Sequence, residues 1–406
     1  MYRHIQARID EALRLFPCVA ILGVRQCGKT TLINNLPKNW KQYDMEKNSG
    51  RELVLRDPDL FFRMNPQHVA IDEAQMVPEL FPALRVAIDD DRNSPGRFII
   101  TGSSSPELSR KISETLAGRI AILELSPFSI AEAYNFSVSD LFLQSFTKYE
   151  AMDTNRHPTR FTLQQILTYW EKGGYPEPWI KKNNRFHDLW MTNYFDNYLN
   201  RDLAELFPKL NRDKYRLFLQ SLSQLSSTII NYSDLGRTLG LSAPTAREYL
   251  EIAHGTFVWR SLPAYEKNAT KRIVKHPKGH FRDCGLLHHL WHINNQRDLL
   301  SYPLMGRSWE SMIIENIIQG FQQTGLIFQP YYYRTGAGAE IDLIIESAKG
   351  ILPIEIKFTQ KINRRDLRAL KDFISERNCP IGWVVHNGES VEWLDDKILG
   401  IPATYL

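Results

Sequence analysis

The chain has 406 residues, of which 43% are hydrophobic and 24% charged, and this is the composition of an ordinary globular protein. Its length is sufficient for two or three domains. The 50 basic and 46 acidic residues give a formal net charge of +4, a balance too even to imply a nucleic-acid partner by itself.

Targeting and redox features favour a cytoplasmic protein. Residues 1–13 read as an amphipathic, charged helix rather than a signal peptide. No apolar run approaches the ~18 residues of a membrane span, so we expect no membrane partner. The four cysteines form no C-x-x-C pair and are expected to be reduced thiols; they are Cys18, Cys27, Cys284 and Cys379.

The first functional motif follows a short apolar run at residues 18–22. Residues 23–30 read Gly-Val-Arg-Gln-Cys-Gly-Lys-Thr and fit the phosphate-binding loop G-x-x-x-x-G-K-[ST]. A chance Gly-rich turn is disfavoured, because a strand precedes the motif and a helical pattern follows it. Lys29 is expected to reach the β and γ phosphates, and the Thr30 hydroxyl to ligate Mg²⁺. The expected nucleotide-binding residues are Gly23, Val24, Arg25, Gln26, Cys27, Gly28, Lys29, Thr30, Thr31 and Asp72.

Two further strands end in polar residues that suit nucleotide hydrolysis. Residues 68–73 end in Asp72, expected to hold Mg²⁺ through water, and Glu73, expected to polarise an attacking water. Alone, this pair is better interpreted as two solvated acids, but not after a phosphate-binding loop. The strand at 97–101 leads to Ser103, our candidate γ-phosphate sensor, with Ser104 beside it; a Ser-rich turn is the alternative.

These strands belong to an alternating strand and helix pattern, which predicts a parallel α/β sheet in a P-loop domain over residues 1–135. The expected strands are residues 18–22, 40–44, 69–71, 97–101 and 120–125. No Asn-Lys-x-Asp guanine-reading motif occurs, so we expect ATP rather than GTP.

The middle of the chain is helical. Residues 136–213 are rich in aromatic residues and are interrupted at Gly173-Gly174-Tyr175-Pro176. Residues 214–270 suggest three short helices and a strand, a winged-helix pattern with a helix capped at Ser242. The basic stretch at 256–282 could track DNA phosphates or form a solvated hairpin, and winged helices also serve as protein contacts. Its basic residues are Arg260, Lys267, Lys271, Arg272, Lys275, Lys278 and Arg282.

The region 271–406 returns to a mixed α/β pattern. Residues 331–334 and 340–345 suggest paired strands, and 352–358 a third. Glu355 and Lys357 share one face of that strand, and facing Asp342 they would form a set able to bind Mg²⁺ for phosphodiester cleavage. The same alternation also describes any half-exposed strand, which is the better interpretation of the spacing alone.

Taken together, these segments resemble a family of bacterial and archaeal AAA-type ATPases. In that family the ATPase is followed by a domain of unknown function, which looks like a restriction-endonuclease-like fold of the PD-(D/E)xK type. The resemblance therefore implies an AAA+ domain (1–135), a helical lid (136–213), a winged-helix-like region (214–270) and a nuclease-like domain (271–406). It covers nearly the whole chain and rests on residues 23–30, 69–75, 100–104, 116–119, 125–129, 173–177, 200–203 and 281–286.

The resemblance also implies residue roles. Arg119 looks like an arginine finger acting on a neighbouring subunit, so a homo-oligomer is expected, and Arg201 resembles a lid arginine that senses the nucleotide. Asp342, Glu355 and Lys357 fall on the D…ExK positions. Glu310 or Glu315 would be the additional acid of that fold.

The sequence thus predicts a Mg²⁺-dependent ATPase with Lys29, Glu73, Ser103 and Arg119 as its catalytic residues. Its expected cofactors are ATP and Mg²⁺, and DNA is a candidate partner. Two alternatives stay open. One is an ATP-regulated nuclease or DNA-processing enzyme, and the other is a non-catalytic scaffold whose conformation depends on nucleotide.

Overall fold

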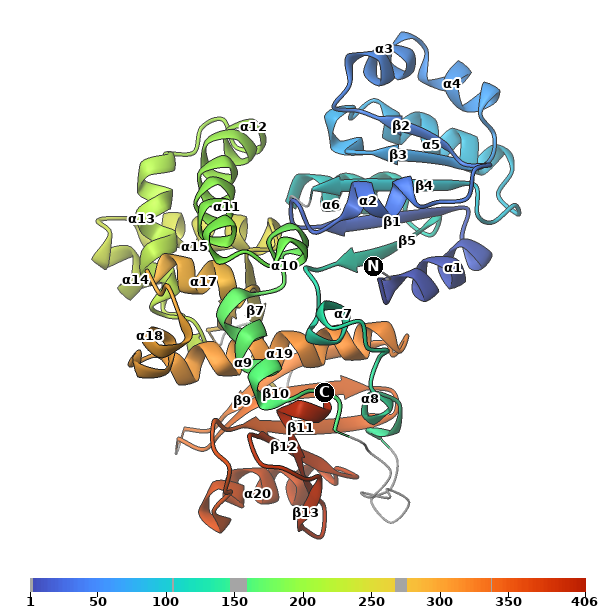
Figure 1. The fold of residues 1–406 in the computed structure, drawn as a ribbon. Coiled ribbons are helices and arrows are strands. Elements are labelled where there is room, and N and C mark those ends of the chain that lie inside the picture. Colours follow the sequence, from blue (N-terminus) through green and yellow to red (C-terminus); the bar gives the residue numbers. More distant parts are fainter. Residues whose placement is uncertain (1–2, 104–105, 147–158, 267–275, 337) are drawn as a thin grey trace. The chain divides into compact units, whose positions relative to one another are not determined.

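The computed structural model describes the chain apart from residues 1–2, 104–105, 147–158, 267–275 and 337 (Figure 1). Ser104 and four of the basic residues considered above, Lys267, Lys271, Arg272 and Lys275, lie outside the described residues. The described residues form two compact units. The first comprises residues 1–128, 175–177 and 251–258, and the second comprises 129–174, 178–250 and 259–406. These units divide the chain more coarsely than the four predicted regions.

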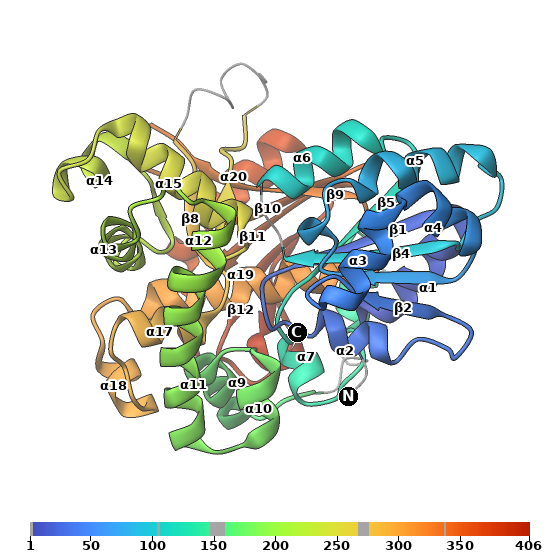
Figure 2. The same ribbon diagram turned by 90° about the horizontal axis from the view of Figure 1, so that it is seen from above.

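The first unit is built on a five-stranded, all-parallel sheet in the order β2-β3-β4-β1-β5. Both faces are covered, with helices α2 and α6 on opposite sides (Figure 2). This explains why β1, β3 and most of β4 are continuous buried runs rather than alternating ones. The strands are β1 (Cys18–Gly23), β2 (Lys41–Asp44), β3 (Val69–Asp72), β4 (Phe98–Ser103) and β5 (Ile120–Leu125), each within two residues of its predicted ends.

The strand order places the predicted phosphate-binding loop at the carboxyl edge of this sheet. Strand β1 lies between β4 and β5, so the chain leaves the carboxyl end of β1 at a switch in strand order, where open α/β sheets bind ligands. The helices of the unit are α1 (Ile5–Leu15), α2 (Lys29–Asn34), α3 (Asn48–Arg56), α4 (Pro58–Met64), α5 (Leu80–Asp90) and α6 (Pro106–Thr115). The charged N-terminal helix predicted from the sequence corresponds to α1.

The second unit begins with helices. They are α7 (Ile130–Ala133), α8 (Asp140–Gln144), α9 (Leu163–Lys172), α10 (Pro176–Lys181), α11 (Asn184–Asn197), the π-helical turn η4 (Tyr198–Asp202) and α12 (Leu203–Leu206). Helix α10 begins in the first unit, since residues 175–177 belong there. None of the helices in the described part of the chain is long and apolar enough to cross a membrane.

The next part of this unit combines helices with a small antiparallel sheet in the order β6-β8-β7. Its elements are α13 (Arg212–Ser223), β6 (Thr228–Ile229), α14 (Tyr232–Thr238), α15 (Ala243–Gly255), β7 (Trp259–Leu262) and β8 (Lys278–Phe281). Helix α15 ends in the first unit. The Ser242 hydroxyl accepts from the Thr245 amide at 3.2 Å, as expected for the predicted N-cap.

The C-terminal part is a six-stranded mixed sheet in the order β13-β14-β12-β11-β10-β9. Its strands are β9 (Phe328–Arg334), β10 (Glu340–Ser347), β11 (Gly350–Ile356), β12 (Gly382–His386), β13 (Glu392–Asp395) and β14 (Ile398–Pro402). Strand β10 pairs antiparallel with both β9 and β11, and its pairing with β9 agrees with the sequence prediction. The remaining helices are α17 (Cys284–Leu290), α18 (Gln296–Ser301), α19 (Met305–Gln323) and α20 (Arg368–Arg377).

Two motifs that are far apart in the sequence are joined inside this unit. The Asp283 carboxylate caps α17 by accepting from the Leu286 amide at 2.9 Å, and it also accepts from the Gly174 amide at 2.8 Å. A Cβ at Gly173 would lie 2.4 Å from the Asp283 carboxylate, and one at Gly285 would lie 2.2 Å from the Lys172 carbonyl oxygen. Glycine is therefore required where α9 ends against α17.

Candidate functional site

The phosphate-binding motif forms a tight loop between β1 and α2. A Cβ at Gly23 would lie only 2.2 Å from the carbonyl oxygen of Leu125 on β5, so the strand can end there only with glycine. Gly28 has φ of 104°, a conformation that favours glycine, and it directly precedes the first residue of α2. The loop therefore turns its backbone into the start of the helix, the geometry in which N–H groups bind phosphate.

Lys29 lies at the centre of this loop. Its side chain is buried, and its ammonium donates to the carbonyl oxygens of Gly23 and Val24, each at 3.1 Å. The same ammonium lies 3.5 Å from the Ser103 hydroxyl at the end of β4. The lysine is thus held within the loop by neutral oxygens, which phosphate oxygens would outcompete because their charge makes the hydrogen bonds stronger.

Glu73 directly follows β3, and its carboxylate contacts Ser103 beside the Lys29 ammonium. It has φ of 52°, and its carboxylate accepts from the Ser103 amide at 3.1 Å and from the Gln75 side chain at 2.5 Å. Burial would raise the pKa of Glu73, but the charge of Lys29 and these hydrogen bonds outweigh it and lower the pKa below its usual value. Glu73 is therefore ionised at neutral pH, as a group that polarises water must be.

Asp72 and Thr30 supply oxygen atoms beside this group. Asp72 is buried and accepts a short hydrogen bond from the Thr101 hydroxyl on β4. Thr30 and Asp72 both line one pocket of about 460 Å³, whose other walls include Gln42, Tyr43 and Asp44. A hydroxyl and a carboxylate on one pocket are ligand types that Mg²⁺ prefers, so these residues fit the predicted metal.

Arg3 is part of this site, although the sequence analysis did not single it out. Its guanidinium donates to the Cys27 carbonyl oxygen at 2.7 Å and to the Ser126 carbonyl oxygen at 2.6 Å, and it lies over the Phe128 ring. Arg3 therefore joins the phosphate-binding loop to the chain that follows β5. No spacing in the sequence marks this residue, since it precedes the loop by two elements.

Arg119 lies at the opposite edge of the same sheet. It immediately precedes β5, and all five strands are parallel, so it lies at their amino ends rather than beside Lys29. Its guanidinium makes two hydrogen bonds to Asp89, at 2.7 and 2.9 Å. Within its own chain Arg119 is therefore separated from the loop, and its predicted action on a neighbouring subunit stays a prediction.

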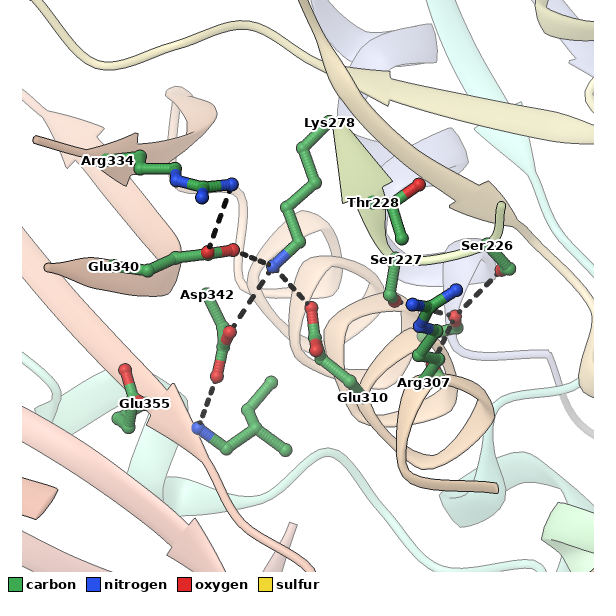
Figure 3. Close-up of polar contacts among 12 residues, drawn as sticks. Ser226, Ser227, Thr228, Lys278, Arg307, Glu310, Arg334, Glu340, Asp342 and Glu355 are labelled. Carbon is green, nitrogen blue, oxygen red and sulfur yellow. Dashed lines mark hydrogen bonds and ion pairs between the residues drawn. The ribbon is translucent and has the colours of Figure 1, made fainter. Parts of the chain in front are cut away.

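The C-terminal acids form a second group of charged residues, shown in Figure 3. Asp342 on β10 accepts from the Ile356 amide on β11 at 2.9 Å, and the Lys357 ammonium lies 2.6 Å from Glu355. The structure adds a residue that was not predicted here: the buried Lys278 ammonium on β8 lies 3.3 Å from Asp342 and 2.7 Å from Glu310. In the described part of the chain no three His, Cys, Asp or Glu side chains are grouped as metal ligands.

Of the two candidate additional acids, only Glu310 belongs to this group. Glu315 is buried five residues further along α19 and contacts Arg260, His280 and Arg282 instead. Burial would raise the pKa of Glu315, but Arg260 and Arg282 reverse this and lower it well below its usual value. Glu315 is therefore a structural anion and not a partner of Asp342.

The contacts of Arg260, Lys278 and Arg282 correct one expectation. The sequence analysis treated these residues as part of a basic stretch that could track DNA phosphates. Lys278 and Arg282 are buried, and all three are engaged with carboxylates. We do not expect them to track a nucleic-acid backbone, because each already contacts a carboxylate inside the second unit.

Arg201, the predicted lid arginine, lies on the π-helical turn η4 and is exposed. Turns of this kind are rare and occur frequently at functional sites. Its predicted role in sensing nucleotide stays a prediction, because Arg201 and the phosphate-binding loop belong to different units.

The fold and the phosphate-binding loop define an AAA-type P-loop ATPase domain. In agreement, residues 16–134 match a family model described as an AAA domain. Two domains of unknown function follow, DUF8612 at residues 163–297 and DUF4143 at 305–406.

The chain is 31% identical over 404 residues to uncharacterized proteins Rv2008c of Mycobacterium tuberculosis and Mb2031c of Mycobacterium bovis. The alignment covers 99% of this chain and 83% of each relative, so the chain belongs to the same protein family.

Among solved structures, the chain is similar to the Walker-type ATPase PABY2304 of Pyrococcus abyssi, with 16% identity and a TM-score of 0.43. That match covers 70% of this chain and 94% of the other. It is also similar to RuvB of Thermotoga maritima, with 16% identity and a TM-score of 0.31, over 64% of this chain and 89% of the other.

Proposed function

We propose that this chain binds ATP with Mg²⁺ and hydrolyses it at the carboxyl edge of the parallel sheet. The observation that carries the proposal is the meeting of three elements at one point. The Lys29 ammonium, the Glu73 carboxylate and the Ser103 hydroxyl come from α2, from the end of β3 and from β4, and each contacts at least one of the others. A cation, an ionised base and a hydroxyl in contact are the groups that attack of water on a γ-phosphate requires.

In this proposal each residue has one task. The loop backbone and Lys29 would bind the phosphates, and Thr30 and Asp72 would hold Mg²⁺, which would supply positive charge beside the phosphates when bound. Glu73 accepts a proton from the attacking water, and Ser103 orients that water relative to the γ-phosphate. Thr101 keeps the Asp72 carboxylate in position through its hydroxyl.

The test compares two substitutions with a nearby control. Lys29→Ala should abolish tight ATP binding, because it removes the loop cation. Glu73→Gln should retain ATP binding but slow hydrolysis by about 10²–10⁴, the contribution of general-base catalysis. Glu79→Gln changes an exposed acid shortly after the same strand and should leave both unchanged. Normal turnover by the Glu73→Gln protein would show that another group polarises the water.

A second candidate function concerns the C-terminal sheet. Asp342 and Glu355 lie on neighbouring strands, and Lys357 contacts Glu355, which is the residue pattern that suggested a nuclease-like domain. In the described part of residues 212–281, three helices and three short strands likewise support a winged-helix-like module that contacts DNA or protein. A fold alone does not establish a reaction, so metal-dependent nicking of plasmid DNA, compared between wild type and Lys357→Ala, is the relevant assay.

Equal nicking by both proteins would identify a contaminant, and no nicking by either would favour a scaffold role for this sheet. ATPase activity measured with and without DNA, on protein of known oligomeric state, separates a DNA-stimulated enzyme from a DNA-independent one.

A further inference from the structure

Lys278 is surrounded by three carboxylates that come from two different elements. Its ammonium lies 2.7 Å from Glu310 on α19, 2.7 Å from Glu340 and 3.3 Å from Asp342, both on β10. Its side chain is only 3% exposed, so water cannot take the place of these contacts. Figure 3 shows the lysine side chain pointing from β8 into the space between the three acids.

The Lys278 ammonium supplies the positive charge that these three acids require. Acids from α19 and β10 would repel one another if they were ionised without a cation between them. Burial would lower the pKa of Lys278, but Glu310, Asp342 and Glu340 outweigh it and raise the pKa above its usual value. The lysine is therefore charged throughout the physiological range and acts as the internal counter-ion of these acids.

A lysine in this position and a divalent ion exclude one another. Mg²⁺ requires oxygen ligands at about 2.0–2.1 Å in near-octahedral geometry and keeps several waters. The ammonium already occupies the space between the Glu310 and Asp342 carboxylates, and its positive charge repels a second cation placed beside them.

We propose that Lys278 is an internal lock, which occupies the cation position of the C-terminal carboxylates and keeps divalent metal out of it. Metal can enter only if the ammonium leaves the space between these carboxylates. Strand β8 is held between β6 and β7, so the lock is part of the small antiparallel sheet and not a mobile side chain on the surface. Any metal-dependent chemistry at Asp342 and Glu355 is therefore switched off while the ammonium stays in place.

The experiment measures Mn²⁺ binding to the full chain by electron paramagnetic resonance, without nucleotide, so that a failure of the ATPase proposal does not affect the result. Wild type should show no Mn²⁺ binding that depends on Asp342. Lys278→Met should gain one Mn²⁺ site at least about tenfold tighter than any in wild type, because one positive charge is removed from among the acids. Lys278→Met combined with Asp342→Asn should lose the gained site.

Lys371→Met is the matched control. Lys371 forms an ion pair with Asp395 elsewhere in the same unit, so the substitution makes the same chemical change away from Glu310 and Asp342. It should not create a Mn²⁺ site. Lys278→Gln serves as a second variant that keeps a hydrogen-bonding side chain, and thermal melting verifies that each protein is folded.

Two results would overturn the proposal. If wild type binds Mn²⁺ and Asp342→Asn abolishes that binding, the lysine does not exclude metal, and this comparison needs no Lys278 variant to fold. If folded Lys278→Met and Lys278→Gln proteins bind no more Mn²⁺ than wild type, the carboxylates are not a cation site that Lys278 occupies.

Discussion

At the scale of single residues, the proposed ATP site depends on side chains that hold the backbone as much as on those proposed to bind the phosphates. The Glu73 carboxylate reaches the Ser103 amide because the chain adopts a left-handed conformation directly after Asp72. Two neighbouring acids in one strand would otherwise point to opposite faces of the sheet. Asp72 and Glu73 can therefore take different tasks although they are adjacent in sequence.

Arg3 provides a prediction at this scale. Arg3→Met removes two charge-assisted hydrogen bonds, to the Cys27 and Ser126 carbonyl oxygens, and should loosen the phosphate-binding loop. Since such bonds contribute about 1.5–3 kcal/mol each, ATP affinity should fall at least about tenfold. Titration of a fluorescent ATP analogue measures this. Arg8→Met, which breaks an ion pair with Glu11 within α1, is the control, and equal affinity in both variants would exclude a role for Arg3.

At the scale of secondary-structure elements, the junction of α9 and α17 depends on close backbone approach. Gly173→Ala would place a methyl group 2.4 Å from the Asp283 carboxylate, at a residue whose φ of 73° disfavours any side chain. Strain of this kind alone costs about 1–3 kcal/mol, so the loss of unfolding free energy should exceed that range once the clash is included.

Gly240→Ala separates the two effects. Gly240 also has a positive φ, of 62°, but nothing lies within 4 Å of its Cβ position. It should therefore show the backbone strain without the clash. Urea denaturation followed by circular dichroism compares the variants, and equal losses of stability would show that the Asp283 contact is unimportant.

The C-terminal sheet gives a pH prediction. The pKa of Glu355 is raised from 4.5 to about 8 by burial and by Asp342, so folding favours its protonated form. Its contribution to stability is therefore present below about pH 4.5 and is lost as the pH rises to about 8. Glu355→Gln should remove this loss, so its melting temperature relative to wild type should be higher at pH 9 than at pH 5. The same substitution at the exposed Glu389 should change the melting temperature by the same amount at pH 5 and at pH 9.

At the scale of the whole molecule, the ATPase is predicted to work between subunits. Arg119 lies at the amino edge of the sheet, away from its own loop, so we predict that the arginine finger implied by the family resemblance acts on a neighbour. Mixing Arg119→Ala with Lys29→Ala protein should restore part of the ATPase activity, since an intact arginine then meets an intact loop. Such arginines contribute about 10³–10⁵ in rate in related systems.

Asp89→Asn is the control for this mixture. It breaks the ion pair that holds Arg119 but keeps the arginine, so it should retain most of the activity if Arg119 acts through the nucleotide. An activity loss in Asp89→Asn equal to that in Arg119→Ala would indicate a structural role. A mixture that co-assembles without any rescue would argue against action between subunits.

The local pattern of the sequence determined much of the first unit. A parallel strand buried on both faces must be a continuous apolar run, and the loop motif must follow such a strand. A window of about ten residues is therefore sufficient to predict both the strand and the loop. The predicted strand ends therefore agree closely with β1 to β5, and Lys29, Glu73 and Ser103 do meet. The same reasoning found the two strands that carry Asp342 and Glu355, and the pairing of the first of them with residues 331–334.

Only the tertiary structure decided which distant residues meet. Glu310 and Glu315 are five residues apart on α19 and equally plausible from sequence, yet only Glu310 reaches Lys278. Lys278 appeared as one of several basic residues in a stretch, whereas burial among acids makes it a counter-ion. Arg3 and Asp283 likewise acquire their roles from contacts across more than a hundred residues. Periodicity reports which face of an element is buried, but the partner on that face is set by how the elements pack.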